Sequence, residues 1–258
     1  MSIENKNTDS HILTSPEIRR FQHQIDLPQF SIKGQEKIKQ AKVVVIGAGG
    51  VGSQVLQLLA ATGVGNITII DDELVSEKNI QLQTLYGGND LGKLKTIISR
   101  QQLLNLFPFI NFEILNLKLN KENIKQFLSG NSIIIDACNT DASHYIINDA
   151  CIELNKPWVY GNVTGVTGEV SVFNFNGGPS YRCLYPHEQH SNTTFNAVSV
   201  SLMYCLAGNI MATECVKIIL NSPGVLSGFI LNVDLFSNIY VKQPVNRIET
   251  NFKIKSTL

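Results

Sequence analysis

The chain has 258 residues, of which 43% are hydrophobic and 16% are charged, and its formal net charge is zero. The composition supports a sizeable core, and the balanced charge gives no reason to expect nucleic acid or an anionic membrane as a partner. Five widely spread cysteines are typical of reduced thiols rather than of a disulfide framework. The reduced cysteines favour a cytoplasmic protein, and no nucleic-acid partner is expected. Because no apolar run approaches the ~20 residues that a membrane span needs, no membrane partner is expected either.

The N-terminal region divides into a polar segment and a helical one. Residues 1–15 are polar and lack the apolar stretch of a secretory signal, so we expect a disordered lead-in there. Two short helical patterns follow within residues 16–40. A single domain is expected to span residues 16–250, because the length does not demand two.

The most distinctive local feature is a glycine-rich turn between two short β-branched segments. The first segment, 42–46, runs into Gly47-Ala-Gly-Gly-Val-Gly52, and the second ends at Asp71. Gly47 permits a tight turn, Gly49 lets the backbone approach a phosphate, and Gly52 lets the following helix pack on the strand. Asp71 is placed to bind ribose hydroxyls. The pattern predicts a nucleotide site, with a purely structural turn as the alternative, and it does not separate a dinucleotide from ATP.

The rest of the first half alternates between helical and β patterns. Residues 72–92 have little periodicity, and so long a connection inside a compact α/β unit is more often functional than idle. A helical pattern follows at 93–106. Short apolar runs predict further strands at 111–116, 132–136 and 157–160. Together with the glycine turn they predict a Rossmann-like nucleotide-binding half at about 41–160.

The pattern changes after residue 160. Alternation over 168–175 predicts an antiparallel ribbon. A long apolar helix follows at about 197–220, and strands are expected at 228–234 and 238–243. We therefore predict an α/β fold in which the Rossmann-like half is continuous with a mixed, largely antiparallel sheet half at about 161–245.

Eight motifs occur in order along the chain: Arg20-Phe-Gln-His-Gln-Ile25, the glycine turn, Asp71-Asp-Glu-Leu-Val-Ser-Glu-Lys-Asn79, Gln83-Thr-Leu85, Leu91-Gly-Lys-Leu-Lys95, Gly168-Glu-Val-Ser-Val-Phe173, Tyr181-Arg-Cys-Leu-Tyr-Pro186 and Ala212-Thr-Glu-Cys-Val-Lys217. This series resembles the ATP-dependent activating enzymes of ubiquitin-like and sulfur-carrier proteins, the ThiF, MoeB and HesA family. The resemblance covers nearly everything from residue 20 to about 241.

The resemblance implies that the glycine turn binds ATP and that the enzyme adenylates the C-terminal carboxylate of a small ubiquitin-like carrier protein or a peptide. Asp71 would hold the ribose, Asn79 would contact phosphate, and Lys95 would neutralise it. An ordinary turn asparagine and a solvated helix lysine are the alternatives for the last two. The implied nucleotide-binding positions are Gly47, Gly49, Gly50, Gly52, Asp71, Glu73, Asn79 and Lys95.

Three positions depart from the family's usual pattern. Its Arg-x-x-Arg-Gln segment supplies an arginine to the partner protomer's ATP, and here Arg20 is kept but His23 replaces the second arginine. Histidine is mostly neutral near pH 7 and cannot make a bidentate phosphate fork. Leu82 stands where the family has another arginine, and Asn139 where it has a magnesium-binding aspartate. Each charge lost from such a site removes transition-state stabilisation.

Two aspartates near Asn139 are the remaining candidates for magnesium ligands. Asp136 ends a predicted strand at the carboxyl edge of the sheet, and Asp141 begins the next predicted helix. A surface acid favoured by the helix dipole is the alternative for Asp141. The resemblance implies that Lys95 and Arg20, together with Asp141 and Asp136, carry catalysis, with ATP and magnesium as cofactors.

Zinc and thioester chemistry are not expected. Many relatives hold zinc with two Cys-x-x-Cys pairs, of which only Cys183 remains. His187 and His190 are interpreted as residues of a solvated loop. The cysteine that accepts the activated group in some relatives aligns with Thr194. The cysteines are interpreted mostly as small core residues.

Three function classes remain. The leading hypothesis is adenylation that stops at the acyl-adenylate, as in members that modify peptides. The second is a catalytically degenerate fold that serves as a peptide- or carrier-binding module. A nicotinamide dehydrogenase explains only the glycine turn and Asp71. The resemblance also implies a homodimer, for which the apolar helix at 197–220 offers surface.

Overall fold

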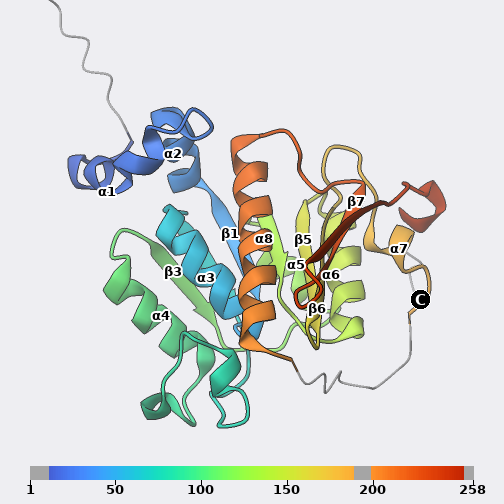
Figure 1. Cartoon of the computed structure of the whole chain (residues 1–258), viewed down its shortest axis with the longest axis horizontal. Coiled ribbons are helices and arrows are strands. Elements are labelled where there is room, and N and C mark those ends of the chain that lie inside the picture. The colour runs from blue at the N-terminus through green and yellow to red at the C-terminus, as the bar shows by residue number, and fades with distance from the viewer. Residues whose placement is uncertain (1–11, 189–198, 253–258) are drawn as a thin grey trace, which may run out of the picture.

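One eight-stranded sheet runs through the described molecule (Figure 1). The structure is a computed structural model that describes residues 12–188 and 199–252. The strand order is β3-β2-β1-β4-β5-β6-β7-β8. The first five strands in this order are parallel, whereas β6, β7 and β8 pair antiparallel. This confirms the predicted α/β fold, with a Rossmann-like half continuous with a mixed-sheet half.

The strands lie close to where the sequence places them. Their bounds are β1 (Lys42–Ile46), β2 (Asn66–Ile70), β3 (Asn111–Leu115), β4 (Ile133–Asp136), β5 (Trp158–Thr164), β6 (Thr167–Phe173), β7 (Phe229–Asp234) and β8 (Ile239–Pro244). β5 extends beyond its predicted end at residue 160, because it pairs with β4 only up to Tyr160 but forms an antiparallel ladder with β6 up to Thr164. That ladder depends on pairing between strands, which the short apolar run does not encode.

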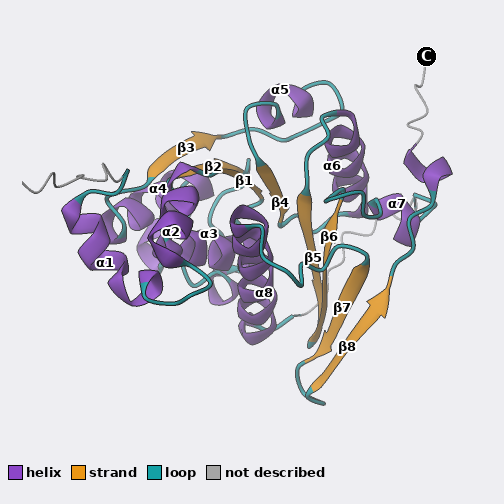
Figure 2. Cartoon of the chain, turned by 90° about the horizontal axis from the view of Figure 1, so that it is seen from above, coloured by secondary structure: helices purple, strands orange, loops and turns teal. Residues whose placement is uncertain are grey.

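Helices cover both faces of the parallel half (Figure 2). Their bounds are α1 (Ser15–Ile25), α2 (Ser31–Gln40), α3 (Gly50–Thr62), α4 (Lys95–Leu106), α5 (Ile124–Leu128), α6 (Asp141–Glu153), α7 (Tyr181–Leu184) and α8 (Ser201–Leu220), with 3-10 turns η1 (Ile80–Leu82), η2 (Gly88–Asp90) and η3 (Glu249–Phe252). α3 and α8 pack on one face, and α6 packs on the other. Since both faces are covered, β1 and β2 are buried along nearly their whole length.

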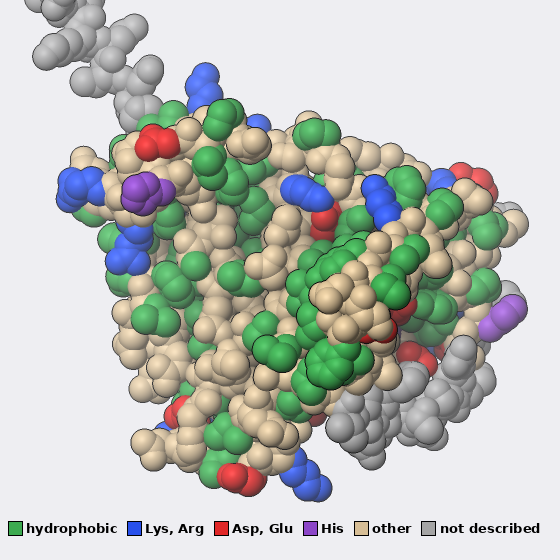
Figure 3. Space-filling model, viewed as in Figure 1, with side chains coloured by type: hydrophobic (Ala, Val, Ile, Leu, Met, Phe, Trp, Pro, Cys, Tyr) green, Lys and Arg blue, Asp and Glu red, His purple; other side chains and the backbone are tan. Residues whose placement is uncertain are grey.

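The mixed half is more open at its edge. All six residues of β8 are exposed. Figure 3 shows hydrophobic side chains gathered over β7 and β8. The exposed hydrophobic residues of β7, β8 and the turn between them are Phe229, Phe236, Ile239, Tyr240 and Val241. This edge therefore differs from the buried parallel half in what it presents to solvent.

The folded part begins earlier than the predicted boundary at residue 15. Leu13 is buried, and the Thr14 side chain caps α1 in a capping box with Glu17. Within the predicted lead-in, residues 1–11 lie outside the described part of the chain.

Helix α8 is long and apolar enough to cross a membrane by length and composition, which the sequence reading did not anticipate. In this structure it packs against α3, β5 and β6. At Gly208 a Cβ would lie 2.6 Å from Cβ of Gln54, so glycine permits the close approach of α8 to α3. A core helix of this kind passes the same test of length and composition.

Candidate nucleotide site

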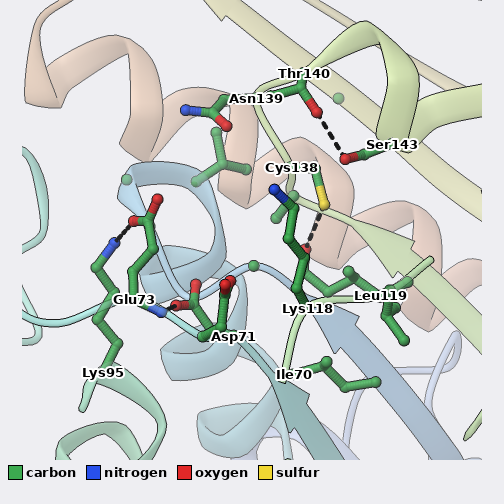
Figure 4. Close-up of a pocket in the computed structure, with 18 of the residues that line it drawn as sticks. Ile70, Asp71, Glu73, Lys95, Lys118, Leu119, Cys138, Asn139, Thr140 and Ser143 are labelled. Carbon is green, nitrogen blue, oxygen red and sulfur yellow. Dashed lines mark hydrogen bonds and ion pairs between the residues drawn. The ribbon is translucent and has the colours of Figure 1, made fainter. Parts of the chain in front are cut away.

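A cavity of about 320 Å³ opens at the carboxyl edge of the parallel strands (Figure 4). Its volume lies in the range of small-molecule sites. The glycine turn, the end of β2, the connection after it, the β3–α5 loop, the β4–α6 loop, the end of β5 and α8 all contribute to its lining. The cavity therefore lies where ligands of such sheets bind, and every predicted nucleotide-binding position except Gly52 lines it.

The glycine turn needs glycine for steric reasons. Gly47 has a φ of +93°, and a Cβ there would lie 2.7 Å from the carbonyl oxygen of Ala137. A Cβ on Gly52 would lie 1.9 Å from the carbonyl oxygen of Gly47. The turn brings the N-terminus of α3 to the cavity, and no side chain caps that end. Its unpaired N–H groups suit a phosphate.

Asp71 is held in place by the turn. One carboxylate oxygen accepts from the backbone N–H of Ala48 at 2.7 Å, and the other from the backbone N–H of Glu73 at 2.7 Å. Burial raises the pKa of Asp71, and the Lys95 ammonium opposes that rise. The side chain is thus oriented before any ligand arrives, as a ribose-binding carboxylate needs to be. Its ribose-binding role stays a prediction.

Lys95 is a buried cation at the edge of the cavity. Only 1% of the residue is exposed, and its ammonium forms an ion pair with Glu73. Figure 4 shows the two side chains meeting beside Asp71. A solvated helix lysine, the alternative considered from the sequence, does not match this burial. Lys95 is therefore available to an anion in the cavity, where it would exchange one negative partner for another.

Asn79 also lines the cavity. It precedes η1, and its side chain caps no backbone group there. An ordinary turn asparagine, the alternative considered from the sequence, would use its side-chain amide to cap the turn, and Asn79 does not. Leu82 of the same turn lines the cavity as well, so the missing arginine leaves an apolar side chain at the site.

The wall formed by the β4–α6 loop is neutral. Cys138, Asn139, Thr140 and Ser143 line the cavity, and the hydroxyls of Thr140 and Ser143 lie 2.7 Å apart. Burial raises the pKa of Cys138, so its side chain is a thiol rather than a thiolate nucleophile. The acidic side chains that line the cavity come from residues 71–73, on the opposite wall.

Asp136 lies behind this neutral wall rather than in the cavity. It is fully buried, and its carboxylate accepts from the backbone N–H of Cys138 at 3.0 Å and pairs with His144 Nδ1 at 2.7 Å. Asp141 is the first residue of α6 and does not line the cavity either. The structure therefore does not bring the two predicted magnesium ligands to the cavity surface, and that role stays a prediction.

His144 is a site-supporting residue that the sequence reading missed. Burial lowers the pKa of His144, but the Asp136 carboxylate outweighs this and the net shift is upward. The pair fixes the end of β4 to α6 directly beneath the neutral wall. The available signal was the Asp136-x7-His144 spacing, which spans a strand end and the first turns of a helix.

Two further lining residues were missed. Lys118 extends from the β3–α5 loop toward Cys138 (Figure 4) and is exposed. Tyr204 of α8 packs on the glycine turn, where a Cβ on Gly50 would lie 2.8 Å from its ring. Neither residue belongs to a motif, and only the fold brings them to the glycine turn.

Arg20 and His23 do not line this cavity. The Arg20 guanidinium donates to the carbonyl oxygen of Leu106 at 3.0 Å and lies over the ring of Phe109. His23 is exposed on the same helix, α1. Within one chain, therefore, the segment that resembles the family's partner-reaching part lies away from its own nucleotide site.

The described residues contain no group of three or more histidine, cysteine or acidic side chains that could hold a metal ion. The Cys183 thiol instead lies 3.3 Å from the backbone nitrogen of Ile248. His187 is exposed. His190 and Thr194, named in the zinc and thioester predictions, lie outside the described residues.

Comparison with known proteins agrees with these observations. The chain matches the ThiF family over residues 21–252. It is 38% identical over 253 residues to a probable molybdopterin-synthase adenylyltransferase of Porphyra purpurea, covering 94% of this chain and 66% of that relative. It is 34% identical over 242 residues to a sulfur carrier protein adenylyltransferase of Thermus thermophilus, covering 91% of this chain and 89% of that relative.

Among solved structures, E. coli MccB with MccA-N7isoASN superposes with a TM-score of 0.80 at 19% identity, over 93% of this chain and 74% of that one. This likeness shows a shared fold. The chain spans about two thirds of the length of the Porphyra relative. With a family match that covers most of its length and a cavity built from the family's motifs, the chain belongs to the ThiF family.

Proposed function

We propose that this chain is an adenylyltransferase of the activating-enzyme type, which transfers AMP from ATP to the C-terminal carboxylate of a small ubiquitin-like carrier protein or a peptide. The observation that carries the proposal is the meeting of an uncapped α3 N-terminus, the fixed Asp71 carboxylate and the buried Lys95 in one cavity. Relatives named sulfur carrier protein and molybdopterin-synthase adenylyltransferases support it. MccB, which shares the fold, has been crystallised with ATP.

The reaction sets the demands on the cavity. A carboxylate oxygen of the substrate attacks the α-phosphorus, a new phosphorus–oxygen bond forms, and the bond to pyrophosphate breaks. Because both reactants are anions, catalysis consists chiefly of holding them in line and placing positive charge where negative charge builds up. The N–H groups of the first turn of α3 and the Lys95 ammonium would do this for the phosphates, while Asp71 would hold the ribose.

Magnesium would screen the remaining phosphate charge when it is bound with ATP. It favours one or two carboxylates together with substrate phosphates and water. Asp71 is engaged by two backbone N–H groups, and Glu73 by Lys95. Within the described chain Asp72 is a cavity-lining carboxylate with no such partner, and Asn139 offers a neutral oxygen. These two residues fit the ion better than Asp136, whose oxygens are both engaged.

The second candidate function is a binding module that keeps ATP or peptide affinity without efficient chemistry. It is favoured by Leu82 and Asn139, which line the cavity at positions where the family resemblance implies an arginine and an aspartate. In such a module Asp71 and Lys95 would bind a ligand or stabilise the fold without supporting adenylation.

Exchange of labelled pyrophosphate into ATP separates the two functions. We expect exchange that requires magnesium and a small carrier ending in Gly-Gly or a peptide with a free C-terminus, and that is lost in Lys95→Ala. Calorimetry with ATP and magnesium serves as the parallel measurement. ATP binding without exchange for any acyl partner would favour the binding module, and absence of ATP binding at millimolar concentration would reject both.

We also propose that the chain acts as a cytoplasmic homodimer. Arg20 lies away from the cavity of its own chain, in the segment that resembles the family's partner-reaching part. If Arg20 acts in the partner's site, mixing the inactive variants Arg20→Ala and Lys95→Ala should restore exchange, because each hybrid dimer then has one site with both residues intact. A monomer by light scattering at micromolar concentration would contradict the dimer.

A further inference from the structure

A row of polar side chains crosses the mixed half of the sheet from the nucleotide cavity. Asn162 on β5 pairs directly with Glu169 on β6, and Glu169 pairs with Asn232 on β7. Directly paired residues of antiparallel strands project from the same face. Asn162 lines the nucleotide cavity and also a second cavity of about 370 Å³, which Glu169 and Asn232 line too. The row therefore connects the two cavities.

The second cavity lies on the sheet face that α8 does not cover. Residues one position away, such as Gly168, project to the other face, where a Cβ would meet Met203 of α8 at 2.7 Å. Thr164, Thr167 and Asp234 form a parallel row in the same cavity. Figure 2 shows β7 and β8 extending beyond the helices that cover the rest of the sheet.

Glu169 carries a charge that the described structure does not compensate. Its carboxylate accepts hydrogen bonds from the hydroxyls of Tyr160 and Tyr185, the latter at 2.9 and 3.0 Å. Burial raises the pKa of both tyrosines, so both are neutral donors. Neutral hydroxyls orient a carboxylate but do not cancel its charge. Among the described residues no lysine, arginine or histidine lies within ion-pair distance of Glu169.

The other acidic residue of the second cavity is already used. The Asp234 carboxylate accepts from the backbone nitrogens of Phe236 and Ser237 and from the Ser237 hydroxyl at 3.0–3.1 Å. It shapes the turn between β7 and β8. Asp234 therefore stabilises a turn, whereas the Glu169 carboxylate is oriented by two tyrosines and binds no backbone group of the described chain.

We propose that Glu169 recognises a positively charged side chain close to the C-terminal carboxylate of the substrate. The inference rests on the proposed adenylation, because that reaction fixes the substrate's carboxylate in the nucleotide cavity. The preceding residues then pass Asn162 and enter the second cavity. Adjacent strands lie ~4.8 Å apart and an extended chain rises ~3.3 Å per residue. A side chain about two to four residues before the carboxylate thus reaches Glu169, and an arginine fits its two oxygens best.

The test uses fluorescein-labelled synthetic peptides that end in Gly-Gly and differ at one position. Arginine, glutamine or glutamate is placed in turn at each of the four positions before the Gly-Gly, and binding to the full chain is followed by fluorescence anisotropy. We expect the arginine peptide to bind about tenfold more tightly than the glutamine peptide at one or two of these positions, as a charged hydrogen bond warrants. Because this comparison uses the wild-type chain, it does not depend on any variant folding.

Variants then locate the effect. Glu169→Gln should abolish the preference for arginine, whereas Glu122→Gln, which removes the same charge from an exposed position outside both cavities, should keep it. Thermal melts establish that both variants fold. The inference is overturned if the wild-type chain binds no arginine peptide at millimolar concentration, if it does not distinguish arginine from glutamine, or if Asp234→Asn and not Glu169→Gln removes the preference.

Pyrophosphate exchange with the same peptides keeps the two proposals apart. Exchange without any preference for arginine would reject the role of Glu169 and leave adenylation standing. Arginine-dependent binding that needs Glu169, with no exchange for any peptide, would reject adenylation and leave Glu169 as a recognition residue of a binding module.

Discussion

The two walls of the nucleotide cavity differ in how completely they are equipped. On the ribose side, Asp71 is held by two backbone N–H groups and Lys95 is paired with Glu73. On the opposite side the wall offers the amide of Asn139 and the hydroxyls behind it. Fixed charge is therefore concentrated on the ribose side, whereas the wall formed by the β4–α6 loop presents neutral groups. Substitutions on each wall should show how much each wall contributes to ATP binding and to pyrophosphate exchange.

The largest effect on ATP binding is expected where both walls depend on the same turn. Gly52→Ala places a Cβ against the carbonyl of Gly47, so the turn must open, at a cost of about 3 kcal/mol in the free energy of unfolding. ATP binding should disappear with it. Gly130→Ala is the control, because a Cβ there meets nothing within 4 Å. Chemical denaturation and calorimetry measure both quantities, and an unchanged ATP affinity would contradict this reading of the turn.

Removing His144 tests whether the neutral wall is rigidly supported. His144→Phe leaves the buried Asp136 carboxylate without its cationic partner, which should lower the free energy of unfolding by about 3–5 kcal/mol. Since the folded pKa of His144 is raised from 6.5, the pair contributes fully below pH 6.5 and loses its contribution as pH rises through the raised pKa. The loss in free energy of unfolding caused by His144→Phe should therefore become smaller as pH rises.

Denaturant unfolding at a series of pH values measures this dependence, with His187→Gln as the control at an exposed histidine. A deficit that stays constant, or grows as pH rises, would show that the pair does not titrate as described.

On the ribose side, Lys95→Ala should reduce pyrophosphate exchange by about a hundredfold, because one fixed cation is commonly worth that much at a developing negative charge. Lys93→Ala is the matched control two residues away, since its side chain is 54% exposed and does not line the cavity. Equal losses in the two variants would mean that general charge, rather than the buried ammonium, is responsible.

On the neutral wall, Asn139→Asp should raise the exchange rate about tenfold or more, a change of about 1.4 kcal/mol in the barrier. The added carboxylate would face the cavity and offer magnesium a charged ligand. Exchange assays of this variant beside Asp136→Asn and Asp141→Asn make the comparison. If Asn139→Asp leaves the exchange rate unchanged and Asp141→Asn lowers it, the magnesium ligand lies on α6 and not in the neutral wall.

The smallest effect is expected at Lys118, which is exposed. Lys118→Ala should weaken ATP binding about threefold at low salt, and the difference should vanish at high salt because exposed charges are screened. Lys121→Ala, an exposed lysine of the same loop that does not line the cavity, is the control. A loss that persists at high salt would indicate a direct contact rather than a general field.

Local signals predicted the ribose side well. The glycine turn and Asp71 lie within one β–α–β unit, so spacing alone places them together, and the helical and β patterns gave nearly all elements within a few residues. The neutral wall was harder. The pairing of Asp136 with His144 depends on how α6 docks against β4, and burial of that aspartate cannot be read from its position at a strand end.

The row of Asn162, Glu169 and Asn232 could not be predicted from the sequence, for a different reason. It exists only because β7, from a distant part of the chain, joins the consecutive strands β5 and β6 in one register, and a shift by a single residue would turn Glu169 to the other face. Alternation within β6 predicted a strand, but nothing in it fixed the neighbouring strands.

Strand β8 has a consequence for how the protein behaves in concentrated solution. Among the described strands it ends the sheet, so one side of its backbone has no strand partner, and its exposed residues include Ile239, Tyr240 and Val241. Such an edge recruits other chains into sheet extension unless something interrupts it. Here Lys242 places its ammonium 3.8 Å from the Phe229 ring centroid, and Pro244 removes a backbone donor at the strand end. Lys242 and Pro244 should therefore oppose the addition of other chains to this edge, and both lie far along the sheet from the nucleotide cavity.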